Sequence, residues 1–240
     1  MKVLLSKDSK YIIEDNVKEI NTKDGIIKIE EGKEVLESHI GKKFSLCEPN
    51  LLDILSKLRR GPQAILPKDA MLLLAYTGLK QGSKILEAGT GNAFLSIQLA
   101  WYLKPRKIYS FEKDTRFYPI AKENVKKAGL EEYIEIINDD VFNYEKYTKN
   151  EKFDLVFLDF EKSSEFVKHA FNLLKNGAYL VIFCPTADSL VKNVEEVKKY
   201  NFDAKVVENI VREWQIEYYF RPKTVGLIHT GFLIVARKIF

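Results

Sequence analysis

Cysteine, methionine, tryptophan and histidine are scarce in this sequence: its 240 residues include two, two, two and three of them. Cys47 and Cys184 lie far apart, and neither has the spacing of a metal ligand, so we interpret both as reduced thiols. Three scattered histidines add no zinc site and no other metal centre. The scarcity of these residues excludes a disulfide-stapled scaffold and a zinc-dependent fold.

Long hydrophobic runs, repeats and low-complexity segments are also lacking. No run approaches the roughly 18 apolar residues of a membrane-spanning helix, and the N-terminus has no signal-peptide pattern. We therefore expect a cytoplasmic protein without a membrane partner. Hydrophobic residues make up 46% and charged residues 30% of the chain, as in ordinary globular proteins. The length allows one complete α/β domain with a small appendage.

The net charge of +4 is mildly basic and permits, without requiring, a nucleic-acid partner. Its distribution is more informative than its size. Arg59 and Arg60 belong to a basic cluster before the first strand of the predicted α/β domain. We interpret these two arginines as candidate contacts for a phosphate backbone, and a solvated, salt-bridged surface is the alternative.

The segment 84–95 carries the clearest binding motif. An apolar strand runs into Glu87, then Gly89 and Gly91, and an amphipathic helix follows. Glycines allow a tight turn and a close ligand, and a helix N-terminus offers free N–H groups. A dinucleotide-binding turn would have a third glycine where this chain has Phe94. The motif therefore favours a ligand that has no diphosphate, and Glu87 would tolerate an ammonium group.

Acidic residues follow four successive predicted strands. They are Glu87, Glu112, Asp140 in the run 138–141, and Asp159. Each alone could be a helix cap or turn residue. Their recurrence favours a shared site, because ligands bind at the carboxyl ends of parallel strands. Glu112 could accept both hydroxyls of a ribose and Asp140 could meet an adenine amino group, which together predict S-adenosylmethionine (SAM) as the cofactor.

The order of the predicted elements gives the fold class and the domains. Residues 1–50 show short alternating runs separated by turns, which indicates a small N-terminal antiparallel β domain. Residues 51–240 alternate strands and helices, as in a parallel sheet, and form the predicted catalytic domain. Two β-rich runs, 204–216 and 226–235, then form a predicted antiparallel hairpin. We therefore expect the α/β fold class, with the Rossmann-like, seven-stranded arrangement of class I SAM-dependent methyltransferases.

Four segments make the chain resemble the tRNA adenine-N1 methyltransferases of the TrmI type. The likeness covers roughly residues 35 to 237, and its most specific parts are the last two segments. The four are Arg60-Gly61-Pro62-Gln63 with Pro67-Lys68-Asp69, Leu86 to Gly91, Val211-Arg212-Glu213-Trp214, and His229-Thr230-Gly231-Phe232-Leu233. The resemblance implies methylation of adenine N1 in the T loop of tRNA, at position 58 and in some archaeal members also at 57. It also implies a homotetramer.

The resemblance also implies roles for single residues. Asp159 would be the catalytic carboxylate, orienting the base and favouring the positive charge that develops on it. The SAM contacts implied by the resemblance, together with those expected from the motif, are Gln63, Glu87, Gly89, Thr90, Gly91, Asn92, Ala93, Glu112, Asp140, Val141 and Asp159.

The target base needs an aromatic face, and two positions near it differ from the family pattern. Asp159 is followed by Phe160-Glu161-Lys162 without the usual proline and tryptophan, and Leu66 replaces an aromatic residue or histidine. An extruded base is normally held by stacking and polar edge contacts. Phe160, Trp214 or Tyr218 could supply the stacking face, and Trp214 could equally belong to the core or to a subunit interface.

Three hypotheses follow. The leading one is a SAM-dependent tRNA adenine-N1 methyltransferase, with Arg59, Arg60, Phe160 and Trp214 as substrate contacts. The second is a non-catalytic RNA-binding subunit of such an enzyme. The third is a class I methyltransferase that acts on a small molecule or a protein. A dehydrogenase is disfavoured by Phe94.

Overall fold

The structure is a computed structural model that describes residues 1–30, 32–61, 64–216, 219–224, 226 and 229–240. The chain folds into two compact units, Met1–Leu58 and Arg59–Phe240. The boundary predicted at residue 50 lies just before helix α1 (Leu51–Lys57), and the first unit continues through that helix.

The first unit is an antiparallel β module followed by helix α1. Its strands are short, and β4, β5 and the first part of β6 alternate between more buried and more exposed residues, as expected for sheets with one covered face. A small core of Leu4, Ile27 and Phe44 fills it. The four-stranded sheet has the order β2-β1-β6-β5, with β3 and β4 as a separate pair. The strands are β1 (Lys2–Leu5), β2 (Lys10–Ile13), β3 (Glu19–Thr22), β4 (Gly25–Lys28), β5 (Val35–Glu37) and β6 (Lys43–Cys47).

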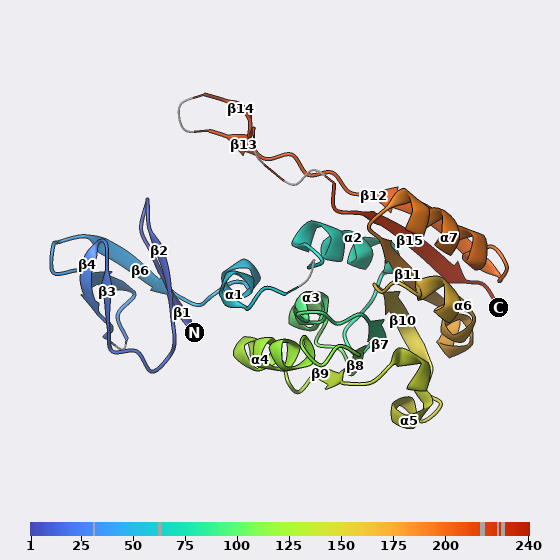
Figure 1. Cartoon of the computed structure of the whole chain (residues 1–240). Helices are drawn as coiled ribbons and strands as arrows, with labels where there is room; N and C mark the ends of the chain where they lie inside the picture. The colour runs from blue at the N-terminus through green and yellow to red at the C-terminus, as the bar shows by residue number, and fades with distance from the viewer. Residues whose placement is uncertain (31, 62–63, 217–218, 225, 227–228) are drawn as a thin grey trace. The chain divides into compact units, whose positions relative to one another are not determined.

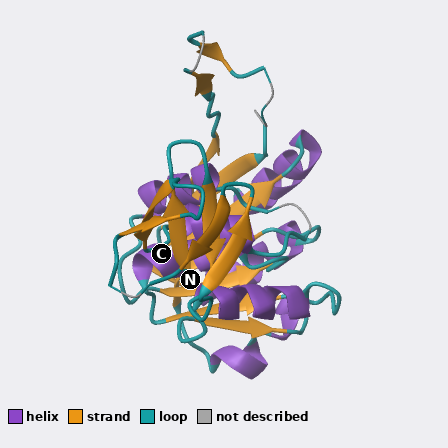
Figure 2. Cartoon of the chain, turned by 90° about the vertical axis from the view of Figure 1, so that its left-hand side faces the viewer, coloured by secondary structure: helices purple, strands orange, loops and turns teal. Residues whose placement is uncertain are grey.

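The second unit contains a seven-stranded sheet with the order β12-β15-β11-β10-β7-β8-β9 (Figures 1 and 2). Strands β7 to β11 are parallel, and β15 runs antiparallel to both of its neighbours. This confirms the predicted seven-stranded α/β sheet with a C-terminal antiparallel pair. The strands are β7 (Lys84–Ala88), β8 (Lys107–Phe111), β9 (Ile134–Ile137), β10 (Phe153–Leu158), β11 (Leu174–Cys184), β12 (Phe202–Glu208) and β15 (Phe232–Lys238).

Helices cover both faces of this sheet. Helices α2, α3 and α4 lie on one face, and α6 and α7 lie on the other (Figure 1). A continuous core of β7, β10 and β11 residues with α6, including Leu86, Val156 and Phe166, is fully buried. None of the helices in the described part of the chain is long and apolar enough to cross a membrane. The helices are α2 (Pro67–Thr77), α3 (Phe94–Leu103), α4 (Tyr118–Ala128), η1 (Val141–Asn143), α5 (Glu145–Thr148), α6 (Ser163–Leu173) and α7 (Ala187–Val197).

The predicted strand 204–216 is wrong in its second half. Strand β12 ends at Glu208, and residues 209–213 leave the sheet. Trp214–Gln215 (β13) instead pairs with Arg221–Pro222 (β14) in a separate hairpin that extends away from the sheet (Figures 1 and 2). The apolar residues of this stretch are exposed, so their pattern reflected an uncovered surface rather than a buried strand.

Candidate active site

A cavity of about 350 Å³ opens at the carboxyl ends of strands β7, β8 and β10 and the start of η1. The residues that follow the four strands line it together, as the sequence predicted for this edge of a parallel sheet. The acidic residues in its wall are Glu87, Glu112, Asp114, Asp139, Asp140 and Asp159. The structure therefore gathers all four predicted strand-end carboxylates around one cavity.

The glycines of the first turn have different tasks. Gly89 has φ +91°, and a Cβ there would lie 2.0 Å from the carbonyl oxygen of Asp159. Its missing side chain thus lets the ends of β7 and β10 approach each other. Gly91 also has a positive φ and donates its N–H to Glu112 Oε2 at 2.8 Å. The turn is shaped by the protein's own packing as well as by space for a ligand.

Glu112 is fixed by backbone donors. Its second carboxylate oxygen, Oε1, accepts the N–H of Asp114 at 2.8 Å, and the side chain is buried. Each carboxylate oxygen can accept more than one hydrogen bond. Glu112 therefore presents two oriented acceptors at the end of β8, suited to a pair of adjacent hydroxyls.

Glu87 is held inside the wall of the cavity. Its Oε2 accepts hydrogen bonds from the hydroxyls of Ser96 on α3 and Ser110 on β8, the latter at 2.7 Å. Burial raises the pKa of Glu87 to about 7, against the lowering effect of these hydroxyls. A cation bound in the cavity would favour the ionised form of Glu87.

The carboxylate of Asp159 differs from that of Glu87 in its hydrogen-bond partners. Its backbone N–H donates to Ala88 O at 2.9 Å, but its carboxylate has no hydrogen bond or ion pair with the described residues. Burial raises the pKa of Asp159 to about 7. Among the residues that the structure describes, nothing occupies the acceptor capacity of this carboxylate, so its oxygens are available to a ligand in the cavity.

The two aspartates that follow β9 differ in their hydrogen-bond partners. Asp139 is committed to the protein, because it accepts hydrogen bonds from Asn143 at 2.7 Å and from Tyr147 at 2.8 Å. Asp140 Oδ1 accepts the N–H of Phe142 at 3.1 Å, and its other oxygen has no described partner. Val141 is buried beside it in the cavity wall. Asp140 is therefore the better acceptor for an amino group.

Four other predicted cofactor contacts have mixed outcomes. Thr90 and Asn92 line the cavity, and Asn92 Nδ2 is a buried donor with no partner among the described residues. Ala93 is absent from the lining: it is fully buried, and its left-handed backbone (φ 63°) turns the chain into α3. Gln63 lies outside the described residues.

Among the predicted substrate contacts that the structure describes, only Phe160 lines the cavity. Its ring also packs against the ring of Phe166, which supports the Phe160 ring in the cavity wall. Arg59 and Arg60 are exposed and absent from the lining. Trp214 lies on the β13–β14 hairpin, 57% exposed and also absent from the lining. Tyr218 lies outside the described residues.

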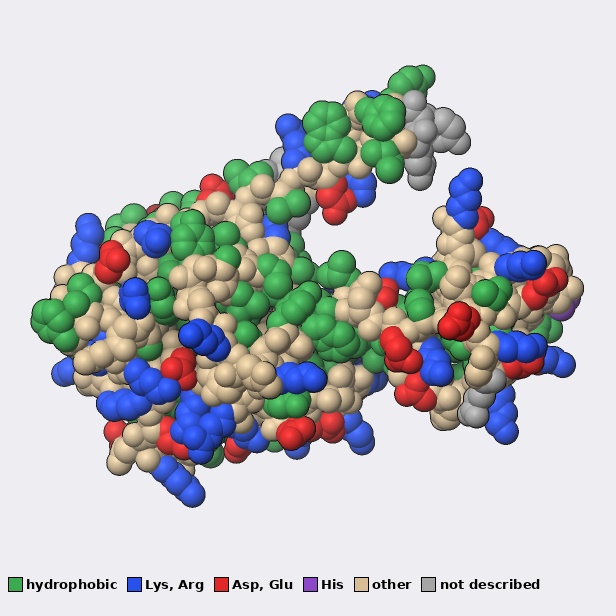
Figure 3. Space-filling view, turned by 180° about the vertical axis from the view of Figure 1, so that it is seen from behind, with side chains coloured by type: hydrophobic (Ala, Val, Ile, Leu, Met, Phe, Trp, Pro, Cys, Tyr) green, Lys and Arg blue, Asp and Glu red, His purple; other side chains and the backbone are tan. Residues whose placement is uncertain are grey.

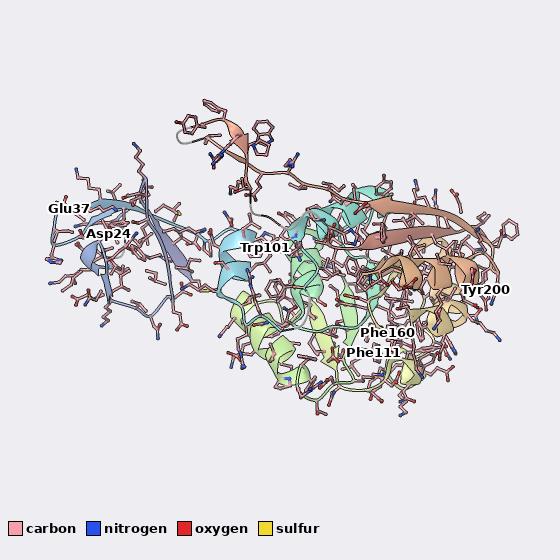
Figure 4. All side chains as sticks on the ribbon, turned by 45° about the horizontal axis from the view of Figure 1, so that its top comes forward. Asp24, Glu37, Trp101, Phe111, Phe160 and Tyr200 are labelled. Carbon is pink, nitrogen blue, oxygen red and sulfur yellow. The ribbon has the colours of Figure 1, made fainter. Side chains whose placement is uncertain are left out.

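Sequence reasoning missed most of the apolar wall. Ile65, Phe117, Phe142, Phe183 and Pro185 all line the cavity, and they come from four separate parts of the chain. Figure 4 labels two residues that line the cavity, Phe111 at the end of β8 and Phe160 just after β10. The position of Phe183 at the end of a buried strand, β11, was a usable signal. Because Phe183 is apolar, however, it was interpreted only as a core residue.

The donor set fits SAM. Carboxylates suit its cationic amino acid end and its ribose hydroxyls, and aromatic rings can cover its adenine. Asp140 Oδ2 and Asn92 Nδ2, which have no partner among the described residues, can bind its polar groups. Within the described ranges, no three His, Cys, Asp or Glu side chains are grouped so that they could hold a metal ion.

The seven-stranded fold and the acid-lined cavity define the class: this is a SAM-dependent methyltransferase of class I architecture. Solved structures agree. A SAM-dependent O-methyltransferase from Thermotoga maritima has a TM-score of 0.84 at 24% identity, over 100% of this chain and 92% of that one. A tRNA (m1A58) methyltransferase TrmI from Aquifex aeolicus has a TM-score of 0.80 at 25% identity, over 100% and 96%.

Sequence comparison is more specific. Residues 49–228 match the family model described as "tRNA methyltransferase complex GCD14 subunit". The chain is 32% identical to the tRNA (adenine(57)-N(1)/adenine(58)-N(1))-methyltransferase TrmI of Methanocaldococcus jannaschii, over 96% of this chain and 92% of that protein. It is 26% identical to the tRNA (adenine(58)-N(1))-methyltransferase TrmI of Thermus thermophilus, over 85% and 80%. The chain belongs to the GCD14 family of tRNA methyltransferases.

Proposed function

We propose that the protein transfers a methyl group from SAM to N1 of adenine in the T loop of tRNA, at position 58 and with position 57 as a second target. Family membership supports the tRNA substrate. The observation that carries the chemistry is the carboxylate of Asp159, which lines the cavity without a hydrogen bond or ion pair to any described residue.

Bound SAM supplies an electrophilic methyl group, and the protein's task is to hold and orient. Glu112 would accept the ribose hydroxyls, Asp140 the adenine amino group, and Glu87 with the 89–92 turn would hold the amino acid end. Adenine N1 has its own lone pair, so the reaction needs no strong base. Asp159 would accept a hydrogen bond from the exocyclic amino group of the target base, which positions N1 and favours the cationic product.

Phe160 would cover one face of the extruded base, since its ring lies in the wall next to Asp159 and is backed by Phe166. Arg59 and Arg60 would contact tRNA phosphates outside the cavity. Arg59 forms an ion pair with Glu123 at 3.2 Å, but the pair is exposed and contributes little, so the guanidinium can exchange partners. We place the reaction in the cytoplasm, with its tRNA substrate.

The decisive experiment is nucleoside mass spectrometry of unmodified tRNA after incubation with the protein and SAM. We expect 1-methyladenosine in the T loop, and Asp159→Asn should lower the rate about a hundredfold or more. Asp154→Asn is the matched control, because Asp154 lies at the other end of β10, away from the cavity. Its carboxylate accepts hydrogen bonds from the backbone N–H of Lys84 and from Lys175 Nζ. No 1-methyladenosine with any T-loop substrate, despite SAM binding measured by calorimetry, would instead favour the RNA-binding or small-molecule alternatives.

We also propose that the β13–β14 segment mediates self-association into a homo-oligomer, a tetramer by the family resemblance. The segment exposes a group of large apolar side chains, and Figure 3 shows them on its surface. They are Ile210, Val211, Trp214, Ile216, Tyr219 and Phe220, exposed by 50% to 82%. Exposed apolar patches of this kind mark interaction surfaces. Light scattering should show an oligomer that Phe220→Asp dissociates, and a monomeric wild type would contradict the proposal.

A further inference from the structure

Two of the segments that carry the family resemblance meet in a buried polar network outside the cavity. Lys68, at the start of α2, donates from Nζ to Asp69 Oδ1 at 2.8 Å and to Thr230 Oγ1 at 2.7 Å. The Thr230 hydroxyl donates in turn to Asp69 Oδ2 at 2.9 Å. Asp69 and Thr230 are 2% and 6% exposed. The network thus joins the Pro-Lys-Asp and His-Thr-Gly segments, to which the proposed chemistry gives no role.

The same network holds the chain where it leaves the sheet. Lys68 Nζ also donates to the carbonyl of Asn209 at 2.6 Å, and the Asn209 side chain donates to the carbonyl of Lys68 at 2.7 Å. Burying an ion pair costs desolvation that its attraction barely offsets, so a buried pair is weak evidence for a stabilising role. Matched donors and acceptors do, however, define a single geometry.

Both segments lead directly into the cavity wall. Ala64 and Ile65 line the cavity just before α2, and the carbonyl of Ile65 accepts a hydrogen bond from the buried Gln98 side chain at 2.9 Å. On the other side, Gly231 follows Thr230. A Cβ on Gly231 would lie 2.6 Å from Phe183 Cζ and 2.8 Å from the carbonyl oxygen of Cys184. The Phe183 ring therefore lies against Gly231 and lines the cavity.

The position of Phe183 in the sheet tells which part of the cavity it shapes. Phe183 lies at the end of β11, which neighbours β10 on the side away from β7, β8 and β9. Glu112 and Asp140 follow β8 and β9, so the proposed cofactor groups lie on the opposite side of Asp159. The wall that includes Phe183 therefore faces the methyl acceptor rather than the ribose and adenine of SAM.

We propose that Lys68, Asp69, Thr230 and Gly231 are positioning residues that hold Ile65 and Phe183 as the acceptor wall of the cavity. The inference rests on the proposed function. It assigns the Pro-Lys-Asp and His-Thr-Gly segments to the placement of the target base against Asp159, with no contact of their own to the cofactor. A shift of the wall by about 1 Å is enough to lower a rate up to about a hundredfold.

The test compares Thr230→Val with Thr77→Val. Thr77 is an equally buried threonine at the far end of α2, where its hydroxyl donates to Leu73 O at 2.8 Å. We expect Thr230→Val to lower kcat/KM for tRNA at least about tenfold with an unchanged Kd for SAM. Thr230→Ser, which keeps the hydroxyl, should restore activity. Thr77→Val should lose thermal stability but keep kcat/KM.

Asn209→Ala is a milder second variant, in case Thr230→Val does not fold, and it should shift kcat/KM in the same direction. Equal kcat/KM values for the Thr230→Val, Asn209→Ala and Thr77→Val proteins would overturn the inference, as would a parallel loss of SAM affinity. A wild-type protein that binds SAM without methylating tRNA marks a failure of the proposed function instead, since that result precedes any comparison of variants.

Discussion

Among the described carboxylates, Asp159 and Glu87 are the two whose pKa is raised, in both cases to about 7 and mainly by burial. An acid with a raised folded-state pKa binds protons that the unfolded chain has released. The free protein should therefore lose stability as pH rises from about 4 through 7. A cation in the cavity would favour the ionised forms and oppose this loss.

The first prediction is that SAM binds more tightly as pH rises from 6 to 8, with release of protons. Affinity should increase by up to about tenfold per pH unit for each proton released. Calorimetry in two buffers of different ionisation enthalpy measures the number released. Asp159→Asn should flatten the dependence, and a pH-independent Kd in the wild type would show that neither carboxylate responds to the ligand.

Gly89→Ala should be much more damaging than Gly129→Ala, although both glycines have positive φ. At Gly129, the C-cap of α4, a Cβ meets nothing within 4 Å, so only the backbone cost of about 1 kcal/mol applies. At Gly89 the Cβ would also collide with the carbonyl oxygen of Asp159. Thermal unfolding of the two variants checks this, and equal losses would mean that β7 and β10 can separate freely.

At the scale of elements, helices α1 and α7 offer a matched pair of capping boxes. Asn50 caps α1 by accepting the N–H of Asp53, and Thr186 caps α7 by accepting the N–H of Ser189. Asn50→Ala and Thr186→Ala should each cost about 1 kcal/mol of stability. Because the caps belong to different compact units, each variant should lower a different transition in calorimetry. One transition shifted alike by both changes would show a single cooperative fold.

The elements that the sequence predicted well were those with local signals. The strand-turn-helix segment 84–95, the acids after β8 to β10 and the final antiparallel pair follow from periodicity and turn chemistry alone. The end of β12 was missed, because residues 210–216 look apolar enough for a buried strand, and only tertiary structure shows that nothing covers them.

The residues of the cavity also differ in how well local sequence signals predict them. Its four predicted acids could be found because each lies at, or within three residues of, the carboxyl end of a strand. Its apolar wall could not be found in this way, because Phe117, Phe142 and Phe183 resemble core residues in sequence, and only the fold places them around one space. Ala93, which was grouped with its neighbours, is buried with a left-handed backbone at the start of α3 and does not line the cavity. The arginine cluster is exposed as expected, but it is not part of the cavity.

At the scale of the whole molecule, the catalytic apparatus belongs to one unit. Every described residue that lines the cavity lies between Ala64 and Pro185, and the two units have separate hydrophobic cores. We therefore predict that a fragment of residues 59–240 folds and binds SAM with a Kd close to that of the full chain. Circular dichroism and calorimetry measure both properties. A fragment that is unfolded or does not bind would show that the first unit is needed to complete the second.

The exposed hairpin has a practical consequence for experiments in solution. The chain has two tryptophans, Trp101 on α3 and the solvent-facing Trp214 on β13. In a Trp101→Phe protein, the remaining indole would be a single fluorophore on the surface proposed to join copies. Its emission should move to shorter wavelength as concentration rises, so dilution alone would give a dissociation curve without any added label.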